Sequence, residues 1–339
     1  MSAEISTEFT KLFGISSPIA SAPMAYATTP ALVASVIKAG GIGFLGAGNE
    51  PSAKLEEMID QTRSKLGTKQ QSLVGMGFVG WVLDKFGSSE NDPRLKTVLD
   101  KRVSAIWLAF GPDLGKYISQ IRGHIKATGH QTRVLVNINT IDEAKKAAND
   151  WKADVIVVQG AEAGGRGSVN SLQTLEFVTQ IVEAIPNGPP ILAAGGVMKG
   201  SQMASLLKIG ASGVVLGTRV LFTPECMFSE EMKQVLINAG PNSTSRSPAY
   251  DLVFPPGVWP EDIQARCIEN KILEEYKIGL DPAERKAKIS SGDVDHLIVY
   301  AGSGVSEVNE IQPTETVVKA IHVEAFAALR SSGSTLIPA

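Results

Sequence analysis

Two glycine motifs that follow short apolar runs are the strongest sign of chemistry in this chain. Gly195-Gly196 follows the run 191–194, and Gly217-Thr218 follows the run 213–216. Glycines at strand ends let backbone N–H groups approach an anion closely, and a following helix N-terminus favours negative charge. The loops after the seventh and eighth strands of a (β/α)8 barrel bind phosphate in this way. A single Gly-Gly would more often be a tight turn, but two motifs about twenty residues apart predict a phosphate site.

A second glycine-rich loop, residues 160–167, holds further polar side chains. Gln159 can donate and accept hydrogen bonds at once, which suits the edge of a flavin or nucleotide ring. Glu162 is either a general base or a partner for amides of its own loop, and we favour the structural role. Gly164 and Gly165 allow a flat ligand to approach the backbone. Arg166 could hold a substrate carboxylate or phosphate, stabilise a reduced anionic flavin, or project into water.

The strands that precede these loops must position them. Short, mostly continuous apolar runs alternate with helix-like segments, and they lie at 19–22, 42–45, 73–78, 105–108, 134–138, 155–159, 191–194 and 213–216. Such runs are typical of parallel strands that are covered by helices. Alternation with helices favours a barrel or a doubly wound sheet. We predict an α/β fold, a TIM (β/α)8 barrel.

The pattern changes after about residue 223. Residues 241–260 are rich in Ser, Pro and aromatic residues, and helices are predicted over 262–276, 282–290 and 314–329. We expect residues 1–223 to form the barrel and residues 224–312 to form a smaller, mainly helical addition over the barrel mouth, on the substrate side. Residues 313–339 should contain a helix that returns to the barrel.

Composition and charge argue against several classes of protein. The 339 residues are 43% hydrophobic, and the net charge of −3 provides no basic field for nucleic acid or anionic lipid. Two cysteines and four scattered histidines suit neither a disulfide framework nor a metal cluster. No apolar stretch reaches membrane-spanning length. We therefore expect no metal, no nucleic-acid or membrane partner, and a cytoplasmic location.

Five motifs, in this order and near these spacings, resemble the nitronate monooxygenase family of FMN-binding TIM barrels. They are Ala22-Pro23-Met24, Ala39-Gly40-Gly41-Ile42-Gly43, Gln159-Gly160 with Glu162-Ala163-Gly164-Gly165, Ala194-Gly195-Gly196-Val197, and Leu216-Gly217-Thr218-Arg219. The resemblance covers most of the barrel and is more specific for the family than for any subclass.

The resemblance implies FMN as the cofactor. Ala22, Pro23 and Met24 would line the flavin ring. Gln159 would face the polar edge of the ring, and Gly77 is also assigned to the cofactor site. The ribityl phosphate end would be held by Gly164, Gly165, Gly195, Gly196, Gly217 and Thr218.

Arg166 is the main departure from the family pattern, which places a histidine there as the base. An arginine stays protonated and cannot be that base, so its role is left open. The family's asparagine after the third strand is also missing from residues 75–78. His296 could replace the lost histidine because it precedes the glycine-rich turn 301–304, although a lone histidine is more often structural. That turn is either the family's glycine segment beside the flavin or a plain surface turn.

The expected function is an FMN-dependent oxidoreductase of nitronate monooxygenase type, which oxidises a nitronate or similar small anion with O2 or another acceptor. The absence of the base argues against nitroalkane oxidation more than against nitronate oxidation, because a nitronate is already an anion and needs no deprotonation. Arg166 could attract such an anion. The alternatives are an NAD(P)H-dependent FMN reductase of a quinone or enoyl thioester, and a non-catalytic FMN-binding protein. A homodimer is possible.

Aromatic residues that could wall a substrate pocket are Trp81, Trp107, Tyr250, Phe254 and Trp259.

Overall fold

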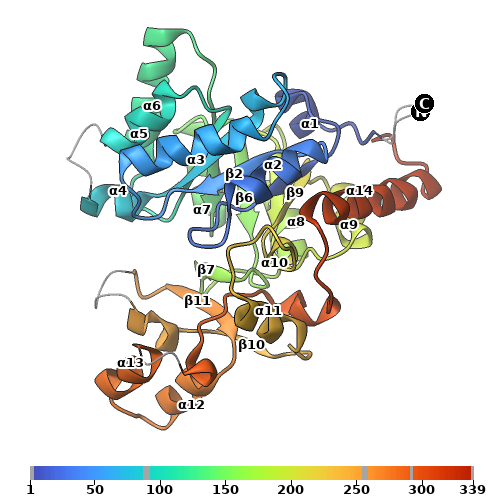
Figure 1. Ribbon diagram of the computed structural model, residues 1–339. Coiled ribbons are helices and arrows are strands. Elements are labelled where there is room, and N and C mark those ends of the chain that lie inside the picture. Colours follow the sequence, from blue (N-terminus) through green and yellow to red (C-terminus); the bar gives the residue numbers. More distant parts are fainter. Residues whose placement is uncertain (1–3, 87–91, 254–258, 291–292, 337–339) are drawn as a thin grey trace.

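The computed structural model describes residues 4–86, 92–253, 259–290 and 293–336. An eight-stranded parallel sheet has the order β1-β9-β8-β6-β5-β4-β3-β2, and a parallel bridge between Ala20 and Ile42 closes it into a barrel (Figure 1). The strands are β1 (Ile19–Ser21), β2 (Gly43–Gly46), β3 (Val74–Val79), β4 (Ala105–Ala109), β5 (Arg133–Ile138), β6 (Val155–Gln159), β8 (Ile191–Ala194) and β9 (Gly213–Leu216). Each lies within one residue of a predicted run, so the TIM-barrel prediction is confirmed.

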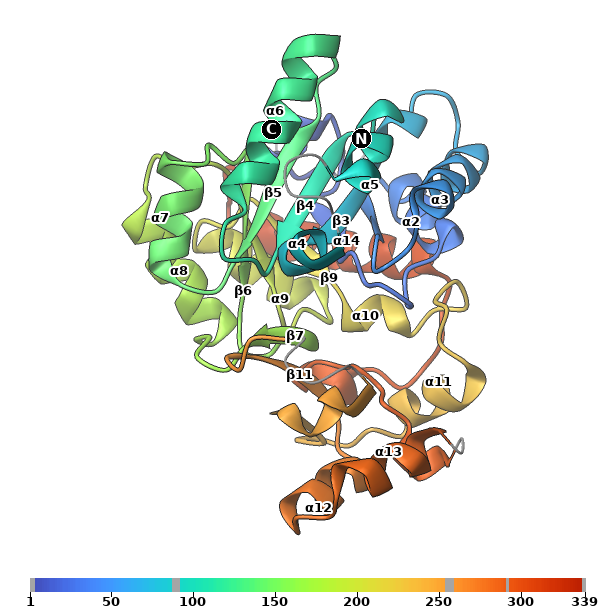
Figure 2. The ribbon, with the colours of Figure 1, turned by 90° about the vertical axis from the view of Figure 1, so that its left-hand side faces the viewer.

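Helices form the outer layer of the barrel (Figure 2). They are α2 (Pro30–Lys38), α3 (Ser52–Ser64), α4 (Gly80–Phe86), α5 (Pro93–Asp100), α6 (Gly115–Thr128), α7 (Ile141–Asn149), α8 (Thr174–Ala184) and α9 (Gly200–Lys208). The short helix α10 (Thr218–Leu221) follows β9 at the barrel end that faces the addition. Local signals explain their limits. In α2, Thr29 caps the helix by accepting from the Leu32 amide, and Pro30 occupies the first turn. The buried stripe of α2, which includes Val33 and Val36, faces the strands.

The barrel interior is a packed core. Phe44 and Trp107 meet edge to face with ring centroids 5.3 Å apart, and Phe9 of α1 (Glu8–Phe13) joins the same buried cluster. Gly75 permits this packing, because a Cβ there would lie 2.5 Å from the Phe44 ring. Trp107 is therefore a core residue, not the wall of a substrate pocket.

The final helix, α14 (Thr314–Ser331), packs against the barrel helices α9 and α2. The Glu324 carboxylate accepts hydrogen bonds from the amides of Gly200 and Ser201, both at 2.9 Å. Glu225 in turn accepts from the amide and hydroxyl of Thr314. Each carboxylate binds the positive N-terminal end of a helix, which ties α14 to the barrel.

The addition contains α11 (Glu230–Ile237), α12 (Lys271–Lys277) and α13 (Pro282–Ser290). It also holds two strands of a small antiparallel sheet, β10 (Thr244–Ser247) and β11 (Ile263–Ile268), which β7 (Gly165–Ser168) completes in the order β10-β11-β7. In Figures 1 and 2 the addition lies at one end of the barrel, where β7 and β11 are side by side. The division of the chain at residues 223 and 312 stays a prediction.

The predicted helix over 262–276 is wrong in its first half, where β11 lies. Ile263, Ala265 and Cys267 are buried at alternate positions, and the last two pack in a cluster with Tyr250. This is a strand pattern of period two. The strand is short, and the residues between its apolar ones are the polar Gln264 and the charged Arg266, so pairing with β7 and β10 decides the structure. Within the described ranges of the chain, no helix is long and apolar enough to cross a membrane.

Candidate active site

The glycine pair after β8 lines a cavity of about 330 Å³. Gly195 and Gly196 have φ angles of +119° and +72°, which residues other than glycine rarely adopt. Ser303, Gly304 and Glu307 border the same cavity. Backbone amides in this conformation, at the carboxyl end of a barrel strand, form the kind of concavity that binds an anion.

Three segments that are far apart in the sequence meet beside this cavity. The Gly302 amide donates to Thr218 Oγ1 at 2.8 Å, and the Ser303 amide donates to the Glu162 carbonyl at 3.0 Å. Gly164 packs so closely that a Cβ there would lie 2.5 Å from the carbonyl carbon of Ala301. Ala301 and Gly302 are buried, so this turn is part of the site and not a plain surface turn.

Glu162 binds the start of the next helix. Its Oε2 accepts from the amide of Thr174 at 2.8 Å and from the Thr174 hydroxyl at 2.7 Å. The Thr174 hydroxyl also lies 3.2 Å from the Gly195 carbonyl. The amide that Glu162 binds therefore belongs to α8 and not to the glycine loop. These contacts support a structural role for Glu162.

The residues assigned to the flavin ring lie at the end of β1. Ala22, Pro23 and Met24 are half-buried. A Cβ at Gly217 would come no closer than 3.8 Å to the Ala22 methyl group and 3.9 Å to the Met24 sulfur, so there is room between these loops. Gly77 packs directly on Pro23, whose side chain a Cβ would overlap. Any contribution of Gly77 to a ligand would therefore act through the position of Pro23.

Gln159 has a neighbour that the sequence reasoning missed. Its Oε1 accepts from Asn137 Nδ2 at 3.1 Å, and its Nε2 donates to the Arg166 carbonyl at 2.8 Å. The side-chain amide retains one N–H and one lone pair for a ligand. Asn137 is buried in β5, and a lone polar residue in the apolar run 134–138 was a signal that could have found it.

Arg166 lies beside aromatic residues. Its guanidinium stacks 4.4 Å from the centroid of the Trp259 ring and forms an ion pair with Asp251. The side chain is only 9% exposed, which excludes projection into water. Trp259 also meets Trp81 and Phe110 edge to face, with centroids 4.7 and 6.0 Å away. This aromatic group joins the addition to α4, which follows β3, and to the loop after β4.

The other predicted pocket residues do not join this group. Tyr250 is fully buried in the core of the addition, where burial raises the pKa of its hydroxyl. Trp107 fills the barrel, and Phe254 lies outside the described residues.

Arg246 of β10 holds the glycine loop. Its guanidinium donates to four carbonyl oxygens, those of Ala163, Gly165, Gly167 and Gln264, at 2.6 to 3.2 Å. Burial, with the nearby charge of Arg266, lowers the pKa of Arg246 to about 10. The neighbouring arginine donates to the Ala161 carbonyl at 3.1 Å. Sequence reasoning missed both residues because no local spacing links them to the loop.

His296 is held within the addition. The ring is 2% exposed, with Nδ1 3.0 Å from Asp293 Oδ2 and Nε2 3.1 Å from Glu275 Oε1. Lys288 and His296 both lower the pKa of the Glu275 carboxyl. These contacts support a structural role, and a catalytic role for His296 stays a prediction.

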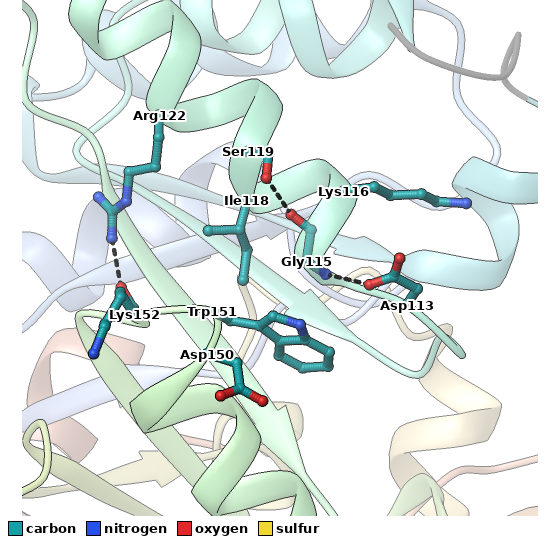
Figure 3. A pocket seen from close by; sticks show the side chains of 9 residues that line it. All are labelled: Asp113, Gly115, Lys116, Ile118, Ser119, Arg122, Asp150, Trp151 and Lys152. Carbon is teal, nitrogen blue, oxygen red and sulfur yellow. Dashed lines mark hydrogen bonds between the residues drawn. The ribbon is translucent and has the colours of Figure 1, made fainter.

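A second hollow of about 480 Å³ opens on the outer wall of the barrel (Figure 3). It lies between α6 and the loop after α7, where Trp151 lies beside Gly115 and Arg122 donates to the Lys152 carbonyl. None of the glycine loops lines it, so it is separate from the site at the strand ends.

Fold and site together define a TIM barrel with a glycine-lined cavity at the carboxyl ends of its strands. Residues 81–324 match the family model described as nitronate monooxygenase, and the chain belongs to this family of flavin-dependent oxidoreductases. A curated relative, the nitronate monooxygenase npaC of Metarhizium robertsii, is 29% identical over 92% of each chain. The nitronate monooxygenase of Neurospora crassa is 29% identical over 91% of this chain and 88% of its own.

Solved structures are similar over nearly the whole chain. A nitroalkane oxidase from Streptomyces ansochromogenes has a TM-score of 0.76 and 26% identity, with 97% of this chain and all of that chain covered. FabK from Thermotoga maritima has a TM-score of 0.79 at 23% identity, over 97% and 99% of the two chains. The FabK likeness shows the fold alone.

Proposed function

We propose that the protein binds FMN at the barrel mouth and oxidises a nitronate or similar small anion, with O2 or another acceptor. The positive-φ pair Gly195-Gly196, which lines a cavity beside Thr218 and the 301–304 turn, is the observation that carries the proposal. When bound, FMN would supply the electron chemistry, and the protein's part is positioning and electrostatics.

The residues present fit this cofactor. The glycine motifs after β8 and β9, Gly195-Gly196 and Gly217-Thr218, would hold the phosphate through backbone amides. A Cβ at Gly165 would meet nothing within 4 Å, and the room over Gly217 is bordered by Ala22 and Met24. Gln159 retains hydrogen-bonding capacity for a ring edge. Arg246 keeps the intervening loop in place through its four carbonyl contacts.

The ion pair changes the interpretation of Arg166. An arginine without a carboxylate partner would attract an anionic substrate, but Asp251 balances this charge. A nitronate would therefore gain less from Arg166 than the sequence suggested, because opposite charges at contact distance largely cancel at longer range.

An anaerobic absorbance titration of the FMN-reconstituted protein tests the proposal. NADH, NADPH and a small alkyl nitronate are added in turn. Bleaching by the nitronate alone supports the proposed function. Bleaching by a nicotinamide nucleotide moves the protein to the reductase class, and retained FMN without bleaching by any of the three supports a non-catalytic flavoprotein. If no flavin spectrum appears after reconstitution, the cofactor proposal fails.

A further inference from the structure

Asp251 brings a carboxylate to the loop position where an arginine replaces a possible base. It lies in the short 3-10 helix Pro248–Val253 of the addition and pairs with Arg166 through Oδ1. Oδ1 is buried, yet the Asp251 side chain is 31% exposed. The exposed part of the side chain therefore lies on its other atoms, and Oδ1 is the oxygen that faces Arg166.

The surroundings suit a base. Burial raises the pKa of Asp251, and the Arg166 charge opposes that rise. A higher pKa makes a carboxylate more basic, while the cation helps to keep it ionised. Cys267 of β11 and Tyr300 also interact electrostatically with Asp251, and burial raises the pKa of both. Both are therefore uncharged near neutral pH, and Arg166 is the charged neighbour that acts on Asp251.

We propose that Asp251 is the group that removes the α-proton of a neutral nitroalkane, and that Arg166 is a positioning residue for it. In this step the Cα–H bond breaks, an O–H bond forms on Oδ2, and the electron pair moves into the nitro group to give a nitronate. The proton then leaves to water. The step needs no oxidant, and it extends the substrate class from nitronates to nitroalkanes at the site of the proposed function, on which it rests.

Solvent deuterium exchange measures this step without turnover. The reconstituted holoenzyme is photoreduced under anaerobic conditions in D2O, and loss of the α-proton signal of nitroethane is followed by NMR against protein-free buffer. Asp251→Asn keeps the shape of the side chain and removes the base, so we expect exchange to fall at least about 100-fold. Asp295→Asn, the same change at an exposed ion pair of the addition, should leave exchange unchanged.

A rescue experiment separates chemistry from structure. Asp251→Asn combined with Arg166→His places an imidazole in the loop, and we expect exchange to return with an acidic limb near the histidine pKa of about 6.5. Reduction of the flavin by preformed nitronate should stay within a few-fold of wild type in Asp251→Asn, because that substrate needs no deprotonation.

Three results would overturn the inference. One is wild-type exchange no faster than in buffer, and another is full exchange in Asp251→Asn. The third is an equal loss of exchange and of nitronate reduction in that variant, which would indicate a structural role. Failure of the wild-type flavin to be reduced by nitronate would instead count against the proposed function, whatever the exchange rates show.

Discussion

Thr218 Oγ1 accepts a hydrogen bond of 2.8 Å from the backbone amide of Gly302, 84 residues further along the chain. Thr218 starts the helix after the last barrel strand, and Gly302 belongs to the turn 301–304, within the residues predicted to form the addition. This bond places the turn beside the proposed phosphate site. Changes in the turn should therefore affect FMN binding although the turn lies outside the barrel strands.

Gly302→Ala should weaken FMN binding about tenfold or more. A Cβ at this position would lie 2.5 Å from the Glu162 carbonyl oxygen, and such overpacking costs about 1–3 kcal/mol. Quenching of FMN fluorescence gives the Kd. Gly123→Ala is the matched control, because a Cβ there meets nothing within 4 Å. Equal Kd values for both variants and the wild type would show that the turn does not shape the proposed phosphate site.

Arg246→Lys should lower the free energy of unfolding by about 2–4 kcal/mol and loosen residues 163–167. A lysine cannot reach four carbonyl oxygens in a fixed fork, so buried acceptors lose their donor. Urea unfolding and limited proteolysis measure the two effects. Arg122→Lys, at a more exposed site, should cost less than about 1 kcal/mol. Similar losses in both variants would refute the scaffold role of Arg246.

Asp251 should make the stability depend on pH. Burial raises the pKa of Asp251 in the folded state above its unfolded value of about 3.9. The protonated carboxyl therefore stabilises the fold fully below that unfolded pKa, and this stabilisation is lost as pH rises through the folded pKa. The difference in free energy of unfolding, wild type minus Asp251→Asn, should fall as pH increases from below about 4 toward 7. A difference that grows with pH would mean that the Arg166 ion pair outweighs burial.

Trp259→Leu should destabilise the protein more than Trp81→Leu. Both changes remove the edge-to-face pair of the two tryptophans, but only the first also removes the stacking of Arg166 and the contact with Phe110. Each aromatic pair contributes about 0.5–1.5 kcal/mol to stability. A cation–π contact contributes about 0.5 kcal/mol when it is exposed and about 2 kcal/mol when it is desolvated. Denaturant unfolding of both variants gives the comparison. Equal losses would show that the Arg166 contact contributes no stability.

The barrel could be read from local sequence. Runs such as 155–159 and 191–194 are buried on both faces, so almost every residue in them is apolar, and glycines mark their ends. The same local logic located the glycine pair after β8, and the start of α2 at Thr29 and Pro30 depends on equally local signals. These features depend on neighbours within a few residues, which is why the sequence by itself determined them.

The surroundings of the glycine loop were decided only by tertiary structure. Arg166 was visible in the sequence, but its partner Asp251 and the stacking of Trp259 arise because β7 pairs with β11 of the addition. The Ala163 carbonyl meets Arg246 across 83 residues in the same way. Charged and polar residues carry no periodic signal that names a distant partner, and burial in the folded chain is what makes such pairs form and persist.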